Sequence, residues 1–159
     1  MRLGTVWVLS ALAVFGLANA RASAQEHPHH HLHHALWELR DARKELKEAK
    51  HDFGGHREKA LKDINAAIKN LDMALKNAGD NIKGAPTRGD LAAEYKKYKH
   101  HPHIHHALHE CKHAHKQLAG SKQLAGSKHD FGGYRAAAQR DIGLAITQLE
   151  LCLKHHKAP

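Results

Sequence analysis

The sequence predicts an all-α protein in which two homologous antiparallel helical hairpins form one four-helix up-down-up-down bundle, preceded by a signal peptide. Three observations predict this fold. Apolar residues recur at steps of three and four along four separate stretches, the period of an amphipathic helix. The pentapeptide HDFGG occurs twice, at 51–55 and 129–133, each time between two such stretches. Aromatic residues make up only 5% of the chain, so the core must consist of Leu, Ile and Ala, which suits closely packed helices.

Residues 1–24 have the features of a secretory signal. Arg2 supplies a positive start, residues 6–17 form an apolar run, and residues 22–24 offer a small-residue cleavage site. The apolar run is short for a membrane span. We therefore expect cleavage, no transmembrane segment in the remaining chain, and a periplasmic or secreted protein.

The first hairpin is predicted over residues 25–78 and the second over residues 103–159. The apolar stripes of the first hairpin are Leu32, Leu36, Leu39 and Leu46, then Leu61, Ile64, Ile68, Leu71 and Leu75. Those of the second are Ile104, Leu108, Cys111 and Leu118, then Ile142, Ile146, Leu149 and Leu153. Together they predict four amphipathic helices.

The two hairpins are copies of one another. Residues 31–50 align with residues 103–122 at a constant offset of 72, and from HDFGG onward the offset is 78. The difference arises because QLAGSK at 117–122 is repeated at 123–128. The sequence leaves open whether this insertion continues the helix or forms a loop.

HDFGG is interpreted as the turn of each hairpin. Asp52 and Asp130 can cap the following helix by accepting hydrogen bonds from backbone N–H groups. The glycine pairs permit positive φ where the chain reverses, and these residues are Gly54, Gly55, Gly132 and Gly133. One hairpin buries its apolar face poorly, whereas two stacked hairpins enclose a core, which explains the duplication.

Residues 79–102 are predicted to be a linker, since GAPTRG within them breaks regular structure. In an up-down-up-down bundle the first and third helices start at one end and the fourth finishes there. The histidine clusters at 27–34 and 100–106 would then converge at that end with His155.

The chain resembles a family of small exported bacterial helical-hairpin proteins. The resemblance is carried by a proline and histidine near a helix start, an Ala-Leu pair after it, and H-D-x-G-G-[HY]-R at the opening of the next helix. The first copy of this pattern uses Pro28, Ala35-Leu36 and 51–57, and the second uses Pro102, Ala107-Leu108 and 129–135. The resemblance implies helical hairpins that pair into a bundle, and it implies no activity. Tyr134 departs from the pattern of the first copy, which has His56 there.

Histidine is unusually frequent, with 19 copies that all follow residue 24. Histidines four apart share one face of a helix, as in His29/His33, His30/His34, His105/His109 and His109/His113. Imidazole is a good ligand for Cu, Ni and Zn, so we expect a site for these ions and no haem or nucleotide cofactor. The candidate metal ligands are His29, His30, His31, His33, His34, His101, His103, His105, His106, His109 and His113.

The helical phase predicts that these ligands form a chelating site on the surface. Relative to the Leu stripes, His34 and His106 should point outward, together with Glu38 and Glu110 four residues after them. This phase argues against a buried di-metal carboxylate centre. It also leaves no inward carboxylate pair for catalysis.

The two cysteines, Cys111 and Cys152, allow two interpretations. In an antiparallel hairpin they reach the same level if the inserted QLAGSK continues the helix, and an exported protein could then join them in a disulfide. Alternatively, Cys111 and His115 share an inward stripe and could act as soft ligands for Cu or Zn.

The functional prediction is an exported His-rich protein that binds divalent transition metal ions as a buffer, scavenger or carrier. The alternative is a non-catalytic structural or interaction module of the cell envelope that binds an anionic partner through its positive charge, which is formally +9 for the full chain and falls when Arg2 and Arg21 leave with the signal. Nucleic-acid binding is not expected, because few aromatic residues are present for base stacking. An enzyme is not expected either, since no nucleophile–base set and no phosphate-binding loop is found.

Overall fold

The computed structural model describes residues 29–80, 100–120 and 130–155. Within these ranges the chain forms α1 (His30–Glu48), α2 (His56–Asn77), α4 (Pro102–Gly120) and α5 (Tyr134–His155), and no strand. The all-α prediction is therefore confirmed. The predicted signal at 1–24, most of the linker, and the second QLAGSK copy lie outside the described residues. None of the described helices is long and apolar enough to cross a membrane.

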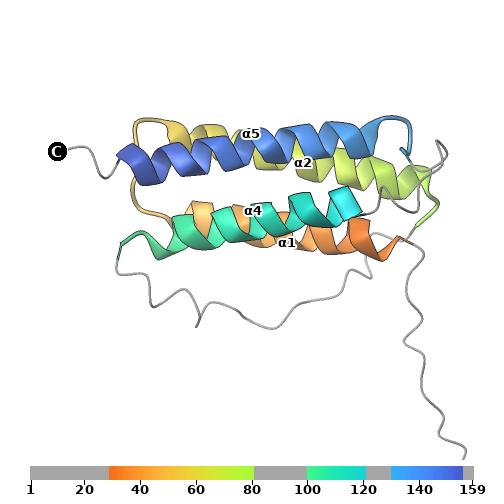
Figure 1. Ribbon diagram of the computed structural model, residues 1–159, viewed down its shortest axis with the longest axis horizontal. Coiled ribbons are helices and arrows are strands. Elements are labelled where there is room, and N and C mark those ends of the chain that lie inside the picture. Colours follow the sequence, from red (N-terminus) through yellow and green to blue (C-terminus); the bar gives the residue numbers. More distant parts are fainter. Residues whose placement is uncertain (1–28, 81–99, 121–129, 156–159) are drawn as a thin grey trace, which may run out of the picture.

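The helices form two layers that pair one repeat with the other. Figure 1 shows α1 beside α4 in one layer and α2 beside α5 in the other. The most extensive packing is between α2 and α5 and between α1 and α4, while the hairpin partners α1/α2 and α4/α5 pack less extensively across the layers. Each layer is thus an interface between equivalent helices of the two repeats.

The direction of the second hairpin differs from the prediction. At the start of α1, Nδ1 of His31 lies 2.9 Å from Oε1 of Gln117 near the end of α4. At the other end of the bundle, the ring of His101, just before α4, packs against Phe53 in the first turn with ring centroids 4.8 Å apart. Because α4 begins where α1 finishes, the order is up, down, down, up rather than up-down-up-down.

The length of the linker explains why the direction of α4 relative to α1 could not be predicted from the sequence. The chain between α2 and α4, residues 78–101, has 24 residues, and an extended chain of that length can reach roughly 80 Å. A helix of 19 residues, such as α1, is only about 30 Å long. The linker is therefore long enough either to return to the near end or to cross the bundle.

The core is built from the predicted apolar stripes. Ala at positions such as Ala35, Ala42 and Ala107 is fully buried and lets the helices approach closely. The largest fully buried apolar side chains are Leu36, Leu39, Leu46, Ile64, Leu71, Leu75, Ile104, Leu118, Ile142 and Leu149. Burial of these side chains, at about 1.5–3 kcal/mol each, is the main stabilising contribution to the fold.

Both HDFGG turns have the backbone conformation that their glycines allow. Gly54 and Gly55 have φ of 66° and 85°, and Gly132 and Gly133 have φ of 73° and 86°. Phe53 also has positive φ, at 54°, and its ring is buried at the end of the core. The turn is therefore stabilised by an aromatic contact as well as by glycine.

The aspartates of the turns act differently from the prediction. The N-cap of α2 is Gly55, which has no side-chain cap. The carbonyl oxygen of Asp52 accepts a hydrogen bond from the backbone N–H of Arg57 at 3.2 Å, and that of Asp130 accepts one from Gly133 at 3.0 Å. The backbone of each aspartate, rather than its carboxylate, closes the turn.

A pseudo-two-fold axis relates the repeats. A Cβ atom on Gly54 would lie 3.1 Å from Nε2 of His155, and one on Gly132 would lie 3.2 Å from Nδ2 of Asn77. His155 and Asn77 are equivalent positions of the two repeats, as are Gly54 and Gly132. The axis therefore exchanges α1 with α4 and α2 with α5.

Candidate metal centre

The candidate centre lies in the α1–α4 interface, where the second half of α1 faces the first half of α4. His106 and Glu110 are four residues apart on α4, and Asp41 and Glu45 are four residues apart on α1, so each pair shares a helix face. The antiparallel packing of α1 and α4 brings the two faces together. His103, one turn before His106, completes the group.

Carboxylates surround both nitrogens of the His106 ring. Nε2 lies 3.2 Å from Oδ2 of Asp41 and 3.5 Å from Oε1 of Glu110. Nδ1 lies 3.1 Å from Oε1 of Glu45. The other oxygen of Glu45, Oε2, is 2.7 Å from Nδ1 of His103. One imidazole therefore connects carboxylates from both repeats.

Most of this group is withdrawn from solvent. The side chain of Glu110 is 0% exposed and that of His106 is 4% exposed, whereas Asp41 at 25% reaches the surface. Neither oxygen of Glu110 makes a hydrogen bond of normal geometry to the residues that the structure describes. Burial of an ionised carboxylate costs several kcal/mol unless a proton or cation compensates its charge. A positive charge beside Glu110 would therefore be stabilised by roughly the same amount.

Burial and the neighbouring charges shift two pKa values in the centre. Burial raises the pKa of Asp41, and Glu110 and Glu45 raise it further, while His106 opposes the shift. Burial alone would lower the pKa of His106, but Glu110, Glu45 and Asp41 together outweigh it and raise this pKa. The metal-free centre therefore holds a proton more tightly than isolated side chains would.

The donor atoms of Asp41, His106 and Glu110 lie close enough together to hold one metal ion. One donor atom from each of the three lies within 4.8 Å of the others. Glu45 is placed to accept the Nδ1–H of His106, a contact that orients Nε2 toward Asp41 and Glu110 and would strengthen it as a metal ligand. Glu45 also belongs to a second, more exposed group with Glu48 and His103.

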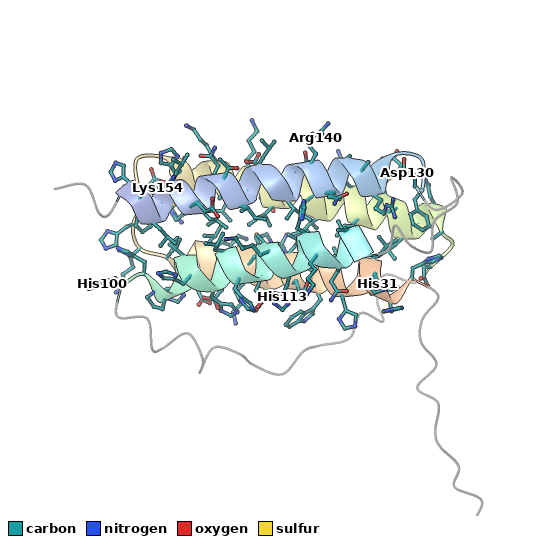
Figure 2. All side chains as sticks on the ribbon, viewed as in Figure 1. His31, His100, His113, Asp130, Arg140 and Lys154 are labelled. Atoms are coloured by element: carbon teal, nitrogen blue, oxygen red, sulfur yellow. The ribbon has the colours of Figure 1, made fainter. Side chains whose placement is uncertain are left out.

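The predicted histidine ligands do not all converge. His100 and His31 lie at opposite ends of the α1–α4 layer (Figure 2). The residues predicted from the N-terminal cluster, His29 to His34, therefore lie at one end, and those predicted from the cluster before and within α4, His101 to His106, lie at the other. The expectation of one His-rich end was wrong because α4 runs in the opposite direction to the prediction.

Individual histidines have distinct surroundings. His33 is buried, with Nε2 3.2 Å from Oδ2 of Asp80, which links the start of α1 to the end of α2. The ring of His30 lies edge-on to that of His34 with centroids 6.3 Å apart. His109 and His113 stack at 4.2 Å. His29 packs edge-on against Phe131, and His105 is half-buried.

The sequence-based prediction that His106 and Glu110 face solvent was also wrong. His106 and Glu110 are buried, and so is Glu38 on α1. The reason is that α4 packs against both α1 and α5, so its buried face is wider than the apolar stripe through Ile104 and Cys111. Inward carboxylates are therefore present, contrary to the sequence-based expectation.

The two cysteines are free thiols and both are buried. The disulfide allowed by the sequence is not formed. Burial raises the pKa of Cys111, and Glu110 and Glu38 raise it further. Burial also raises the pKa of Cys152 to about 11, with Asp52 adding to the shift. A protonated thiol is a poor metal ligand, which disfavours the alternative of Cys111 with His115.

Sequence reasoning missed the two acids that α1 contributes to the centre. Asp41 and Glu45 carry no signal of their own, because acids four apart on a charged helix usually face solvent. The available signal was the matched pairs His34/Glu38 and His106/Glu110 in the two repeats. Whether these pairs face solvent or a neighbouring helix depends on the antiparallel packing of α1 on α4.

Comparison with known proteins adds no family assignment: no family model, no curated protein and no solved structure matches this chain.

Proposed function

We propose that this protein is an exported, non-catalytic binder of divalent transition metal ions, acting as a buffer, scavenger or carrier. In this proposal Asp41, His106 and Glu110 are the ligands, and Glu45 orients His106. The observation that carries the proposal is Glu110, a fully buried carboxylate beside a buried imidazole without a well-formed hydrogen bond from the described residues. A bound cation would compensate its charge.

The ligand set indicates which ions to test. One imidazole with two carboxylates suits Zn²⁺, and it is harder than the all-imidazole cluster expected from the sequence, so Mn²⁺ is also a reasonable ion. Cu²⁺ and Ni²⁺ follow from the general affinity order of divalent ions. Asp41 is partly exposed, so an ion can enter and leave, as a buffer or carrier requires.

The test is calorimetric titration of the purified protein with Zn²⁺, Mn²⁺, Cu²⁺ and Ni²⁺. Glu110→Gln removes the buried charge while it keeps the shape of the side chain. Glu58→Gln is the matched control, since Glu58 is exposed in the first turn of α2, outside the α1–α4 interface. Circular dichroism verifies that both variants are folded.

We expect saturable binding with Kd below about 1 µM in the wild type and in Glu58→Gln. Binding should weaken at least about tenfold in Glu110→Gln. Equal affinity in Glu110→Gln and wild type would show that the ion does not use this centre. Absence of saturable binding would reject metal handling and favour the alternative of an envelope module with an anionic partner.

A further inference from the structure

The pseudo-two-fold axis produces a second constellation in the same interface. Because the axis exchanges α1 with α4, each residue of the centre has an equivalent in the other half of the α1–α4 interface. At the repeat offset of 72, His106, Glu110, Asp41, Glu45 and His103 correspond to His34, Glu38, His113, Gln117 and His31. The second set therefore comes from the same two helices with their contributions exchanged.

One short contact is found in both halves. Nδ1 of His31 lies 2.9 Å from Oε1 of Gln117, as Nδ1 of His103 lies 2.7 Å from Oε2 of Glu45. These two contacts are equivalent under the repeat offset. The structure thus preserves the outer contact of the centre in its second copy, although a neutral amide has replaced the carboxylate.

A further contact in the second set joins the two helices. Nδ1 of His113 lies 3.8 Å from Oε1 of Glu38, across the interface from α4 to α1. Ligands of one Zn²⁺ at bond lengths of about 2.0–2.2 Å stand roughly 3–4 Å apart. His34 is on the same face of α1 as Glu38, one turn earlier.

Burial distinguishes Glu38 from an ordinary surface carboxylate. Its side chain is 2% exposed, whereas His113 is 39% exposed. His31 and His113 project from the side of the α1–α4 layer that faces away from α2 and α5 (Figure 2). An ion from solvent can therefore bind first to the half-exposed imidazole of His113 and then contact the buried carboxylate of Glu38.

The chemistry of the second constellation differs from that of the first. Where the first has Asp41 and Glu45, the second has His113 and Gln117. Two negative charges are lost and one imidazole is gained. An imidazole-rich set with one carboxylate favours Cu²⁺, Ni²⁺ and Zn²⁺ over Mn²⁺.

We propose that Glu38 and His113, which are already in contact, form a second metal site that His34 completes by turning toward them, selective for Cu²⁺, Ni²⁺ and Zn²⁺ over Mn²⁺. The site extends the proposed function, but it uses other residues, so either site can fail alone. His109 stacks on His113 at 4.2 Å and His30 lies edge-on to His34, so each of these two ligands has a second imidazole beside it.

The test counts Zn²⁺ ions bound per chain by calorimetry and native mass spectrometry. The variants are Glu38→Gln, Glu110→Gln and the double variant. Glu58→Gln is again the control, because Glu58 is an exposed carboxylate on α2 outside both proposed ligand sets. We expect two ions in the wild type and the control, one in each single variant and none in the double variant.

The outcomes separate the two sites. The second site would be overturned if Glu38→Gln still bound two ions. It would also be overturned if the wild type bound only one ion and Glu38→Gln bound that ion equally well. Loss of an ion in Glu38→Gln but not in Glu110→Gln would support the second site and overturn the first. A folded double variant that still binds two ions would reject both.

A residue exchange tests the selectivity. His113→Asp gives the second site the residue that the first site has at the equivalent position. We expect the ratio of Cu²⁺ to Mn²⁺ affinity at this site to fall at least about tenfold, measured by competition in the Glu110→Gln background. The Cu²⁺ electron paramagnetic resonance spectrum should also lose one nitrogen coupling. An unchanged ratio and an unchanged number of nitrogens would overturn the role of His113.

Discussion

The α1–α4 and α2–α5 interfaces share one architecture but differ in what they bury. Both are antiparallel pairs of equivalent helices, of 19 residues each in α1 and α4 and 22 each in α2 and α5. Among the described residues, α1 and α4 bury His33, Glu38, Glu45, His106 and Glu110, whereas α2 and α5 bury only Arg135 and Asp141 as polar or charged side chains.

The buried acids of the two interfaces also differ in their partners. Asp141 on α5 accepts a hydrogen bond from Asn70 of α2 at 2.8 Å and another from Arg140 at 3.1 Å. Glu110 on α4 has no comparable hydrogen bond from the described residues. In the α2–α5 interface the buried acid is therefore paired within the protein, while in the α1–α4 interface the partner that we propose for Glu110 is a metal ion.

The largest effect should come from the apolar interface. Leu149→Ala on α5 removes a fully buried side chain and should lower the free energy of unfolding by about 3 kcal/mol, because a cavity remains. Urea unfolding measures this loss. Leu144→Ala, on the same helix but 49% exposed, is the control and should change stability by less than about 0.5 kcal/mol. Equal losses in the two variants would contradict the stabilising role of this interface.

Each interface contains one thiol, and neither should react readily in the folded protein. With a pKa of about 11, Cys152 is about one-thousandth thiolate at pH 8, against about a quarter for an ordinary thiol. Burial and two carboxylates raise the pKa of Cys111 further. Labelling with a chromogenic disulfide at pH 8 should be at least about 100-fold slower in the folded than in the unfolded protein. Labelling of either thiol at the unfolded rate would contradict its burial.

The polar interface should gain stability when a buried charge is removed. Glu110→Met replaces the carboxylate with an apolar side chain and should raise the free energy of unfolding of the metal-free protein by about 1 kcal/mol. It should also remove the stabilisation that Zn²⁺ provides through this centre, which reaches about 2.7 kcal/mol at 100 times the Kd of the centre. Thermal unfolding with and without Zn²⁺ measures both effects. A loss of stability in the metal-free variant would show that Glu110 supports the fold directly.

The smallest effect concerns pH dependence within the α2–α5 interface. Burial raises the pKa of Asp63 above 3.8, and Asp141 raises it further, so folding disfavours the ionised carboxylate. The free-energy cost of ionising Asp63 in the folded protein is absent below pH 3.8 and fully present above its raised pKa. Asp63 therefore lowers the free energy of unfolding as the pH rises from 3.8 to that pKa.

Asp63→Asn should therefore raise the melting temperature at pH 7, on the order of 2 °C, and leave it unchanged at pH 3. Asp72→Asn is the control with the opposite sign, because it removes an ion pair with Arg40 at 3.3 Å. A decrease at pH 7 in Asp63→Asn would contradict the unfavourable charge.

The helices and turns of this fold could be predicted from the sequence because their causes are local. Apolar residues at steps of three and four define the buried stripes, and HDFGG repeats a turn that requires positive φ at its glycines. The direction of the second hairpin could not be predicted, since it depends on packing between repeats. Both directions bury the same stripes, and the linker reaches either end.

The candidate site was predictable only in part for the same reason. His103 and His106 belong to a visible cluster, but Asp41 and Glu45 become neighbours of His106 only when α1 and α4 are antiparallel. Glu38 and Glu110 were assigned to the surface because the phase was measured against a narrow apolar stripe. Contact of α4 with two helices widened its buried face.

The pseudo-two-fold axis has a further consequence for how the two halves can change. In a homodimer of single hairpins, one substitution would alter both symmetric sites at once. Within one chain, Asp41 and His113 occupy equivalent positions but are encoded separately. Each half can therefore acquire its own ligand without loss of the other, and a symmetric scaffold can carry two unequal affinities.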